Sequence, residues 1–235
     1  MSLWNAFILV LALIATAAVA TRPAWAQETG TLITNRAAEI DRGAPAAARR
    51  TMEAFMSCLV GRYTGRATAL TRLPIDSPQY ERTFRNMFES VGDECIGSSG
   101  QLRFSAGLFR SGLFQSLYAR EFAREPAPDF SAVTDTGYRQ LYGENLSAET
   151  RTALALERFG ECVSRADPEG VRSFLQQLPG APGEGQAIRA LMPRFSGCIP
   201  ADQTITFSPS ILKGAMAEGI YRLSVAARDM QRGAQ

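Results

Sequence analysis

Apolar residues recur at helical spacing along most of this chain beyond residue 50. The first such stretch places its large side chains three or four positions apart, on one face of a helix. Its apolar face consists of Met52, Phe55, Met56, Leu59, Val60 and Tyr63. Further amphipathic stretches, separated by Gly, Pro and Ser turn signals, predict a short helix over 67–73, one over 78–91 and one that opens at Ser105.

The C-terminal half repeats this pattern at a nearly constant offset. The stretch 95–105 returns as 198–208. Matched pairs upstream of it are Phe55 with Phe159 and Cys58 with Cys162. The repeat predicts a second set of helices, which begin after the caps Ser147, Asp167 and Ser208. We therefore predict an all-α fold of two tandem disulfide-stapled helical repeats, related by internal duplication and packed as a pseudo-two-fold helical domain.

Small residues four positions apart mark the last helix of each repeat. They are Gly112 and Ser116 in the first repeat and Ala215 and Gly219 in the second. Small side chains at this spacing let two helices approach closely, so we expect these two helices to pack together about the pseudo-two-fold axis. The alternative is that these small residues reflect simple backbone economy and play no part in helix packing. The preceding helix of the second repeat contains Pro193, which removes a backbone donor and should kink or shorten it.

The duplication divides the chain into segments. They are a signal peptide (1–26), a flexible N-terminal arm (27–46), helical repeat 1 (47–124), a Pro/aromatic strap (125–146), helical repeat 2 (147–228) and a frayed tail (229–235). Because the strap combines Pro with Phe130, Tyr138 and Tyr142, we expect it to be ordered. The glycine-rich stretch 180–185 is interpreted as a connector, since no Lys-Ser/Thr pair follows to complete a phosphate-binding loop.

The first residues differ in composition from the rest. Residues 3–20 are nearly all apolar, and Ala24-Trp25-Ala26 follows as an A-x-A cleavage site, which is typical of a secretory signal peptide. We predict cleavage after Ala26; cleavage after Ala20 and retention as a membrane anchor are the alternatives. The mature protein is expected to be periplasmic or secreted, with no membrane attachment beyond the signal peptide.

The chain contains four cysteines at wide spacings, with no C-x-x-C motif. In an exported protein this pattern predicts two disulfides rather than a redox or metal site. Of the three pairings that four cysteines allow, the repeat favours Cys58 with Cys95 and Cys162 with Cys198, because this choice gives both repeats the same cross-link.

Charge and composition exclude several classes of function. The formal net charge is only +2, and the chain contains no His. Without a strong basic field, nucleic acid and anionic lipid are disfavoured as partners. The absence of imidazole removes His general bases, His-ligated zinc and c-type haem attachment. We therefore expect neither a metal nor a cofactor.

The clearest catalytic pattern is Ser210-Ile211-Leu212-Lys213, at the start of the last helix. It resembles the Ser-x-x-Lys element of penicillin-binding proteins and β-lactamase-type acyl-transfer enzymes, in which a Ser nucleophile lies within reach of a Lys able to lose its proton. The resemblance covers these four residues, and the Ser-Asp-Asn and Lys-Thr-Gly elements are absent. The first repeat has Gly107 and Arg110 at the two matching positions, so the cation recurs without the nucleophile.

Arg110 and Lys213 therefore occupy equivalent positions, one turn into the last helix of each repeat. A cation there opposes the positive end of the helix dipole, so it needs either an internal carboxylate or an anionic ligand nearby. Tyr138 and Tyr142 of the strap are candidates for the wall of such a groove. In contrast, Glu157 and Glu161 lie one turn apart and are interpreted as an ordinary like-charged pair on an exposed helix face.

These patterns favour an exported, non-catalytic binding or structural module. Its ligand is expected to be an unknown protein or a small anion, bound where the two repeats meet. The alternative function is a small periplasmic hydrolase that uses Ser210 and Lys213.

Overall fold

The structure is a computed structural model that describes residues 31–33, 46–89, 95, 105–200, 203–205 and 207–233. The chain divides into two units, Met1–Thr31 and Leu32–Gln235, and every helix named below belongs to the second. The expected signal peptide and most of the expected N-terminal arm lie outside the described residues.

The described residues are mostly helical, which confirms the all-α class. The α-helices are α3 (Ala46–Arg62), α4 (Thr64–Thr71), α5 (Pro78–Glu89), α6 (Ala106–Glu121), α7 (Ala148–Ala166), α8 (Pro168–Leu175), α9 (Pro182–Phe195) and α10 (Pro209–Gly233). The strap contains the 3-10 turn η1 (Arg139–Leu141). Two three-residue strands, β1 (Thr31–Ile33) and β2 (Gln203–Ile205), pair as a small sheet.

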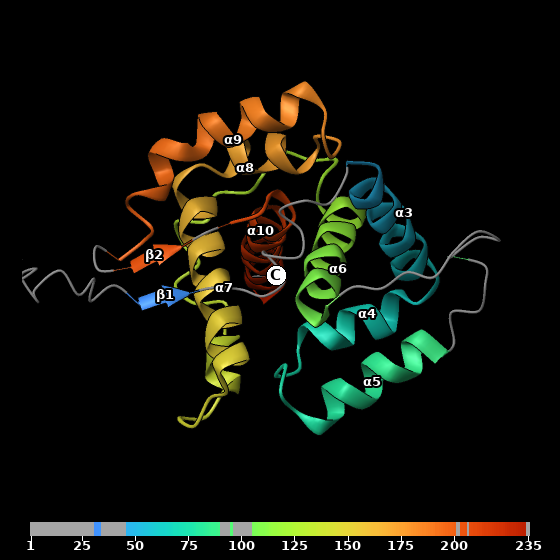
Figure 1. Cartoon of the computed structure of the whole chain (residues 1–235). Helices are drawn as coiled ribbons and strands as arrows, with labels where there is room; N and C mark the ends of the chain where they lie inside the picture. The colour runs from blue at the N-terminus through green and yellow to red at the C-terminus, as the bar shows by residue number, and fades with distance from the viewer. Residues whose placement is uncertain are drawn as a thin grey trace, which may run out of the picture. The chain divides into compact units, whose positions relative to one another are not determined.

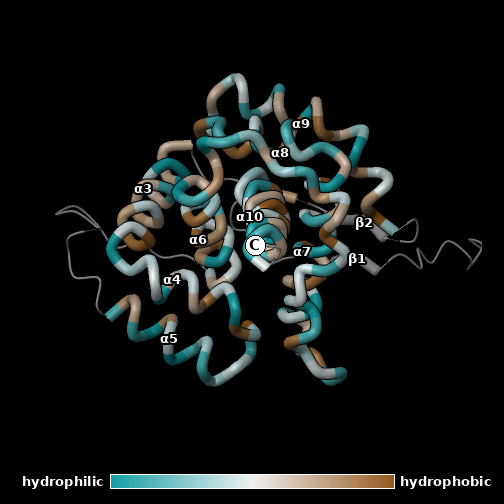
Figure 2. The backbone as a smooth tube through the Cα atoms, turned by 180° about the vertical axis from the view of Figure 1, so that it is seen from behind, coloured by the Kyte–Doolittle hydropathy of each residue, from teal (hydrophilic) through white to brown (hydrophobic). Residues whose placement is uncertain are grey.

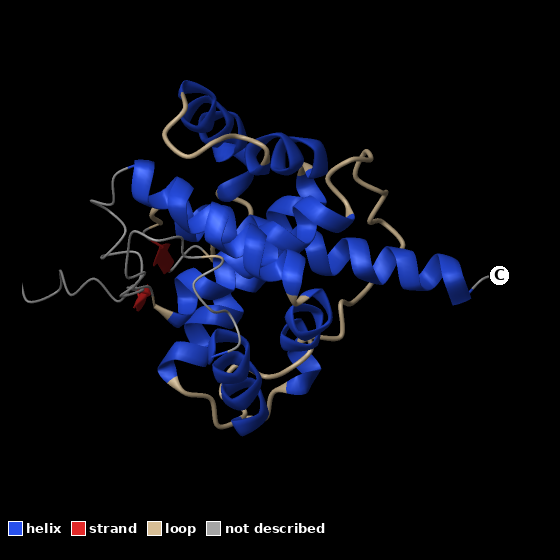
Figure 3. Ribbon diagram, turned by 90° about the vertical axis from the view of Figure 1, so that its right-hand side faces the viewer, coloured by secondary structure: helices blue, strands red, loops and turns tan. Residues whose placement is uncertain are grey.

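Helix α10 lies at the centre of the helical arrangement (Figure 1). It packs along α6 and along α7, and α3 packs in turn against α6. Every residue of α10 from Ile211 to Ser224 is buried, whereas its last turns project beyond the other helices (Figure 3). The outer helices α5 and α9 alternate between hydrophobic and hydrophilic positions (Figure 2), as expected of helices that cover a core on one face.

Local capping explains why several helices begin where the sequence predicts. Ser105 Oγ accepts a hydrogen bond from the Leu108 amide at 3.3 Å, and Ser147 Oγ accepts one from the Thr150 amide at 3.1 Å. Asp167 caps α8 in the same way, with Pro168 in the first turn. These contacts satisfy amide donors that have no partner inside the helix.

The small residues bring helices together, but in different pairs from those expected. A Cβ atom added at Gly160 of α7 would lie 1.9 Å from the Ala215 carbonyl oxygen, and one at Gly219 would lie 2.2 Å from the Gly160 carbonyl carbon. Ala215 and Gly219 therefore admit α7 rather than α6. The α6–α10 contact uses Gly214 and Ser111 instead, since a Cβ at Gly214 would lie 2.1 Å from Ser111 Oγ.

Both predicted disulfides are confirmed. Cys58 is bonded to Cys95, and Cys162 is bonded to Cys198, over sequence separations of 37 and 36 residues. Among the described helices, none combines the length and the hydropathy that crossing a membrane requires.

Two boundaries differ from expectation, and the helix that contains Pro193 ends two residues beyond it. Helix α9 begins at Pro182 and so includes part of the stretch interpreted as a connector; only Gly180, with a φ of 75°, has the backbone conformation of a turn glycine. Pro193 lies in the last turn of α9, and the helix continues past it to Phe195. The expected frayed tail starts at Asp229, whereas α10 remains helical through Gly233.

Candidate functional site

A buried cluster of charged side chains connects α6 and α10. Its centre is Glu218 of α10, whose Oε2 accepts a hydrogen bond from Arg110 Nε at 2.9 Å and whose Oε1 accepts one from Arg110 Nη2 at 2.5 Å. Arg222, one turn further along α10, donates from Nε to the same Oε1 at 2.9 Å. All three residues are at most 9% exposed. One carboxylate thus pairs with two guanidinium groups in the interior.

The strap covers this cluster with aromatic side chains. Arg110 Nη2 donates a hydrogen bond to the Tyr138 hydroxyl at 2.6 Å, and the Arg222 guanidinium carbon lies 3.3 Å from the centroid of the Tyr138 ring. The hydroxyls of Tyr138 and Tyr142 are hydrogen-bonded to each other, and Tyr142 accepts a further bond from the Ile75 amide at 3.1 Å. The strap is therefore ordered here by polar contacts to both halves of the chain.

On the α7 side, the strap is held by carboxylates. Arg139 Nη1 donates to Glu161 Oε2 at 2.8 Å and to Glu157 Oε2 at 3.2 Å, and Arg165 Nη2 donates to Glu161 Oε1 at 2.7 Å. Glu157 has no exposed surface and Glu161 is 6% exposed. The interpretation of these two residues as an exposed pair is wrong, because the strap covers this face of α7.

Glu157 is the most perturbed acid of the cluster. Burial, together with the nearby Glu218 and Glu161 carboxylates, raises the pKa of Glu157 to about 7, although Arg139 and Arg222 act in the opposite direction. Its Oε1 atom has no hydrogen-bond partner among the described protein groups. Burial likewise raises the pKa of the Tyr138 hydroxyl far above its ordinary value. The Glu157 carboxyl group, with a pKa of about 7, therefore changes charge near neutral pH.

Lys213 lies apart from this cluster. Its ammonium group donates to Glu53 Oε1 of α3 at 2.8 Å and to the Gln177 carbonyl oxygen at 2.7 Å, and the residue is 3% exposed. It is thus directed at Glu53 and Gln177 rather than at Ser210. Of the four predicted contact residues, the structure brings together Arg110, Tyr138 and Tyr142 and places Lys213 elsewhere, and each of the two cations has an internal carboxylate partner.

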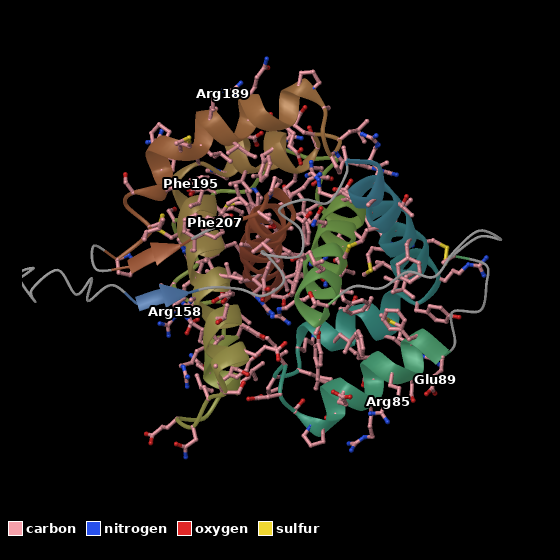
Figure 4. The ribbon with its side chains drawn as sticks, in the orientation of Figure 1. Arg85, Glu89, Arg158, Arg189, Phe195 and Phe207 are labelled. Carbon is pink, nitrogen blue, oxygen red and sulfur yellow. A yellow bond between two sulfur atoms is a disulfide. The ribbon has the colours of Figure 1, made fainter. Side chains whose placement is uncertain are left out.

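A groove runs along a neighbouring face of α7, beside the Cys162–Cys198 disulfide. Its volume is about 740 Å³. The described residues that line it are Leu146, Arg151, Leu154, Ala155, Arg158, Phe159, Cys162 and the turn 197–200. Figure 4 shows Arg158 on this side of α7, well apart from the surface residues Arg85 and Arg189. None of these lining residues is acidic.

Sequence reasoning did not single out Glu218 and Arg222, nor the burial of Glu157 and Glu161. The available signal for the first pair is an acid and a base one helical turn apart, in a helix otherwise rich in small and apolar residues. For Glu157 and Glu161, the available signal is that the sequence contains Arg139 and Arg165, which can pair with these acids. Within the described part of the chain, no three His, Cys, Asp or Glu side chains are placed to hold a metal ion.

Comparison with known proteins identifies no relative of this chain. No protein-family model, no curated protein and no solved structure matches it.

Proposed function

We propose that this chain is an exported, non-catalytic helical module that binds a partner. The observation that carries the proposal is the environment of Lys213, whose ammonium group is held between Glu53 and the Gln177 carbonyl. A Lys that activates a neighbouring Ser needs its nitrogen directed at that Ser, and here the nitrogen ties α10 to Glu53 of α3 and to the Gln177 carbonyl oxygen.

We further propose that the module arose by internal duplication and is organised about a pseudo-two-fold axis. Ser111 and Gly214 are equivalent positions in the two halves, and they lie against each other where α6 meets α10. Contact between equivalent residues is what a two-fold axis requires. The close approach of Gly112 to Met56 also has its counterpart, since the equivalent positions Ala215 and Gly160 adjoin each other.

The ion pairs support the same axis. Lys213 pairs with Glu53. The position equivalent to Lys213 in the first half is Arg110, and the position equivalent to Glu53 in the second half is Glu157. Both of these belong to the buried cluster, where Arg110 takes Glu218 as its partner instead. The two polar sites differ in their surroundings. The strap covers the cluster that contains Arg110 and Glu157, whereas the Lys213–Glu53 pair lies apart from it.

Export is supported by the two disulfides, because such bonds persist in oxidising compartments. Intact-mass measurement of the protein recovered outside the cytoplasm is expected to give a chain that begins at Gln27. A recovered species that still begins at Met1 would identify the first segment as an anchor and would contradict export as a free protein.

In-cell cross-linking of the exported protein, followed by mass spectrometry, tests the binding function. We expect the wild-type protein and a Ser210→Ala variant to recover the same partner in the same amount. The competing hydrolase function is tested with a fluorescent penicillin, which acylates the nucleophile of Ser-x-x-Lys enzymes. Covalent labelling at Ser210 that disappears in the Ala variant would overturn the non-catalytic assignment.

A further inference from the structure

The groove beside the second disulfide is formed by one face of α7. Arg151, Leu154, Ala155, Arg158, Phe159 and Cys162 recur three or four positions apart, which places them on a single stripe of the helix. With a rise of 1.5 Å per residue, this stripe is about 16 Å long. The turn 197–200 forms the opposite wall, and the Cys162–Cys198 bond fixes that wall to the helix.

Among the described residues that line the groove, every charged side chain is positive. Arg151 and Arg158 are both exposed and lie about 10 Å apart along the helix axis, two turns from each other. Arg151 Nη1 donates to the Leu146 carbonyl at 2.6 Å, and Arg158 makes no ion pair with any residue that the structure describes. Two acids of α7 do not offset this charge, because Glu157 and Glu161 are held on the strap side by Arg139. The third, Glu149, lines a different pocket.

The surface between the two arginines is apolar. Leu154 and the half-buried Ala155 form its floor, Phe159 lies beneath it at 2% exposure, and Ile199 forms part of the facing wall. A phosphate group would require several cationic donors directed at one point. Two cations separated by an apolar floor instead match two separate carboxylates with apolar side chains between them.

We propose that this groove binds an extended peptide segment of a partner protein, in which two acidic residues three positions apart flank apolar residues. This inference rests on the proposed binding function and specifies its site and its partner. In the polyproline conformation, side chains return to the same face every third residue and advance by about 9 Å, close to the separation of the two arginines. The apolar residues of the segment lie on Leu154, Ala155 and Ile199.

The direct test is peptide binding to the full-length mature protein with both disulfides intact. The probe is a capped peptide that repeats Glu-Pro-Leu, and the matched control has the same composition with its glutamates adjacent to each other. Fluorescence anisotropy is expected to show saturable binding of the probe, weakened by added salt, and at least fivefold weaker binding of the control. Absence of saturable binding, or equal binding of both peptides, overturns the proposal.

Variants locate the site. Replacing both groove arginines (Arg151→Gln with Arg158→Gln) is expected to weaken probe binding about tenfold, as the loss of two exposed ion pairs implies. The matched control is Arg85→Gln with Arg189→Gln, which removes the same charge from exposed positions on α5 and α9 and should leave binding unchanged. Equal weakening by both double variants would show that peptide binding depends on the net charge alone, and it would overturn the groove as the binding site.

A photo-cross-linking residue placed in exported protein separates failure of this inference from failure of the proposed function. At Ala155 in the groove, it is expected to cross-link a protein whose attached peptide is acidic and apolar; at Arg189 it should not. Cross-links at Arg189 alone would contradict the groove and leave the binding function standing. A cross-link from Ala155 to the N-terminal arm of the same chain would assign the groove to that arm and contradict a partner, and no cross-link at either position would contradict both.

Discussion

At the scale of single residues, the buried charges are stable only as a set. Glu218 accepts from Arg110 and Arg222 at once, and both guanidinium groups also lie against the Tyr138 ring. Removing an ion from water carries a penalty of several kcal/mol, which a partner offsets only with good geometry. Two cations therefore depend on one carboxylate, and the loss of that carboxylate affects both.

We expect Glu218→Ala to lower the free energy of unfolding by about 3–5 kcal/mol, because it leaves two buried guanidinium groups without a counter-ion. Guanidinium chloride denaturation followed by circular dichroism measures the loss. Glu81→Ala is the control, since Glu81 pairs with Arg85 where both side chains are more than 60% exposed. It should change stability by about 0.5 kcal/mol or less. Similar losses in the two variants would contradict the role given to Glu218.

Glu157 should make stability depend on pH. Its pKa is about 7 in the folded protein and ordinary, near 4.5, in the unfolded chain, so between these values only the folded state holds the proton. The stabilising contribution is complete below pH 4.5 and is lost as the pH rises through 7. Over that window the free energy of unfolding should fall by up to about 3 kcal/mol from this group.

The variant Glu157→Gln tests this expectation, because the neutral amide has no proton to lose. Denaturation between pH 4 and pH 8 should give a flatter profile for the variant than for the wild type. Glu125→Gln, at an exposed position of the strap, is the control and should leave the profile unchanged. An unchanged slope in Glu157→Gln would show that this carboxyl group titrates normally.

At the scale of helices, side-chain size decides which elements meet. Gly160 and Gly219 place the backbones of α7 and α10 in direct contact, whereas Gly112 admits the side chain of Met56 from α3. Between α6 and α10 the contact is Ser111 against Gly214. Particular glycines therefore set how closely these pairs of helices approach each other.

Gly160→Ala is expected to destabilise the protein by about 1–3 kcal/mol, because its methyl group would overlap the Ala215 carbonyl oxygen and force two backbones apart. The matched variant is Gly61→Ala in α3, where a Cβ meets nothing within 4 Å. There the better helix propensity of Ala should stabilise the protein by about 0.5–1 kcal/mol. Thermal and chemical unfolding of the two variants should shift in opposite directions, and a shift of Gly160→Ala toward greater stability would refute the close approach.

At the scale of the whole described chain, covalent and ionic links have different ranges. Each disulfide closes a loop within one half, whereas ion pairs connect the halves. Among the described residues these pairs include the buried Arg110 with Glu218 and the partly buried Lys213 with Glu53 and Arg49 with Glu184. The disulfides thus constrain each half, and the charges fix one half on the other.

Removal of either disulfide should have nearly the same effect, because the two loops are almost equal in length. We expect Cys58→Ser with Cys95→Ser, and separately Cys162→Ser with Cys198→Ser, to lower the free energy of unfolding by about 2–4 kcal/mol each. Urea denaturation under non-reducing conditions compares the two variants. If one pair proved dispensable while the other were essential, the equivalence of the two halves in stabilising the fold would be contradicted.

The sequence by itself determined the features that depend on neighbouring residues. Ser105, Ser147 and Asp167 act through amides three positions away, so the helix starts could be predicted from short stretches. The disulfide pairing was also predictable, because the proposed internal repeat favoured the same cross-link in both halves. These signals fixed the class of the fold and the order of its elements.

The tertiary structure alone decided which helix faces are buried and which charges meet. On α7, Glu157 and Arg158 are adjacent in sequence, yet one is fully buried under the strap and the other lies exposed in the groove. Helical periodicity identifies the faces of a helix but not what packs against each face. Arg110 likewise takes its partner from a residue 108 positions away, and nothing within a short stretch of sequence specifies that choice. The free energy of burying a charge depends on where its partner lies in space, and the fold as a whole sets that position.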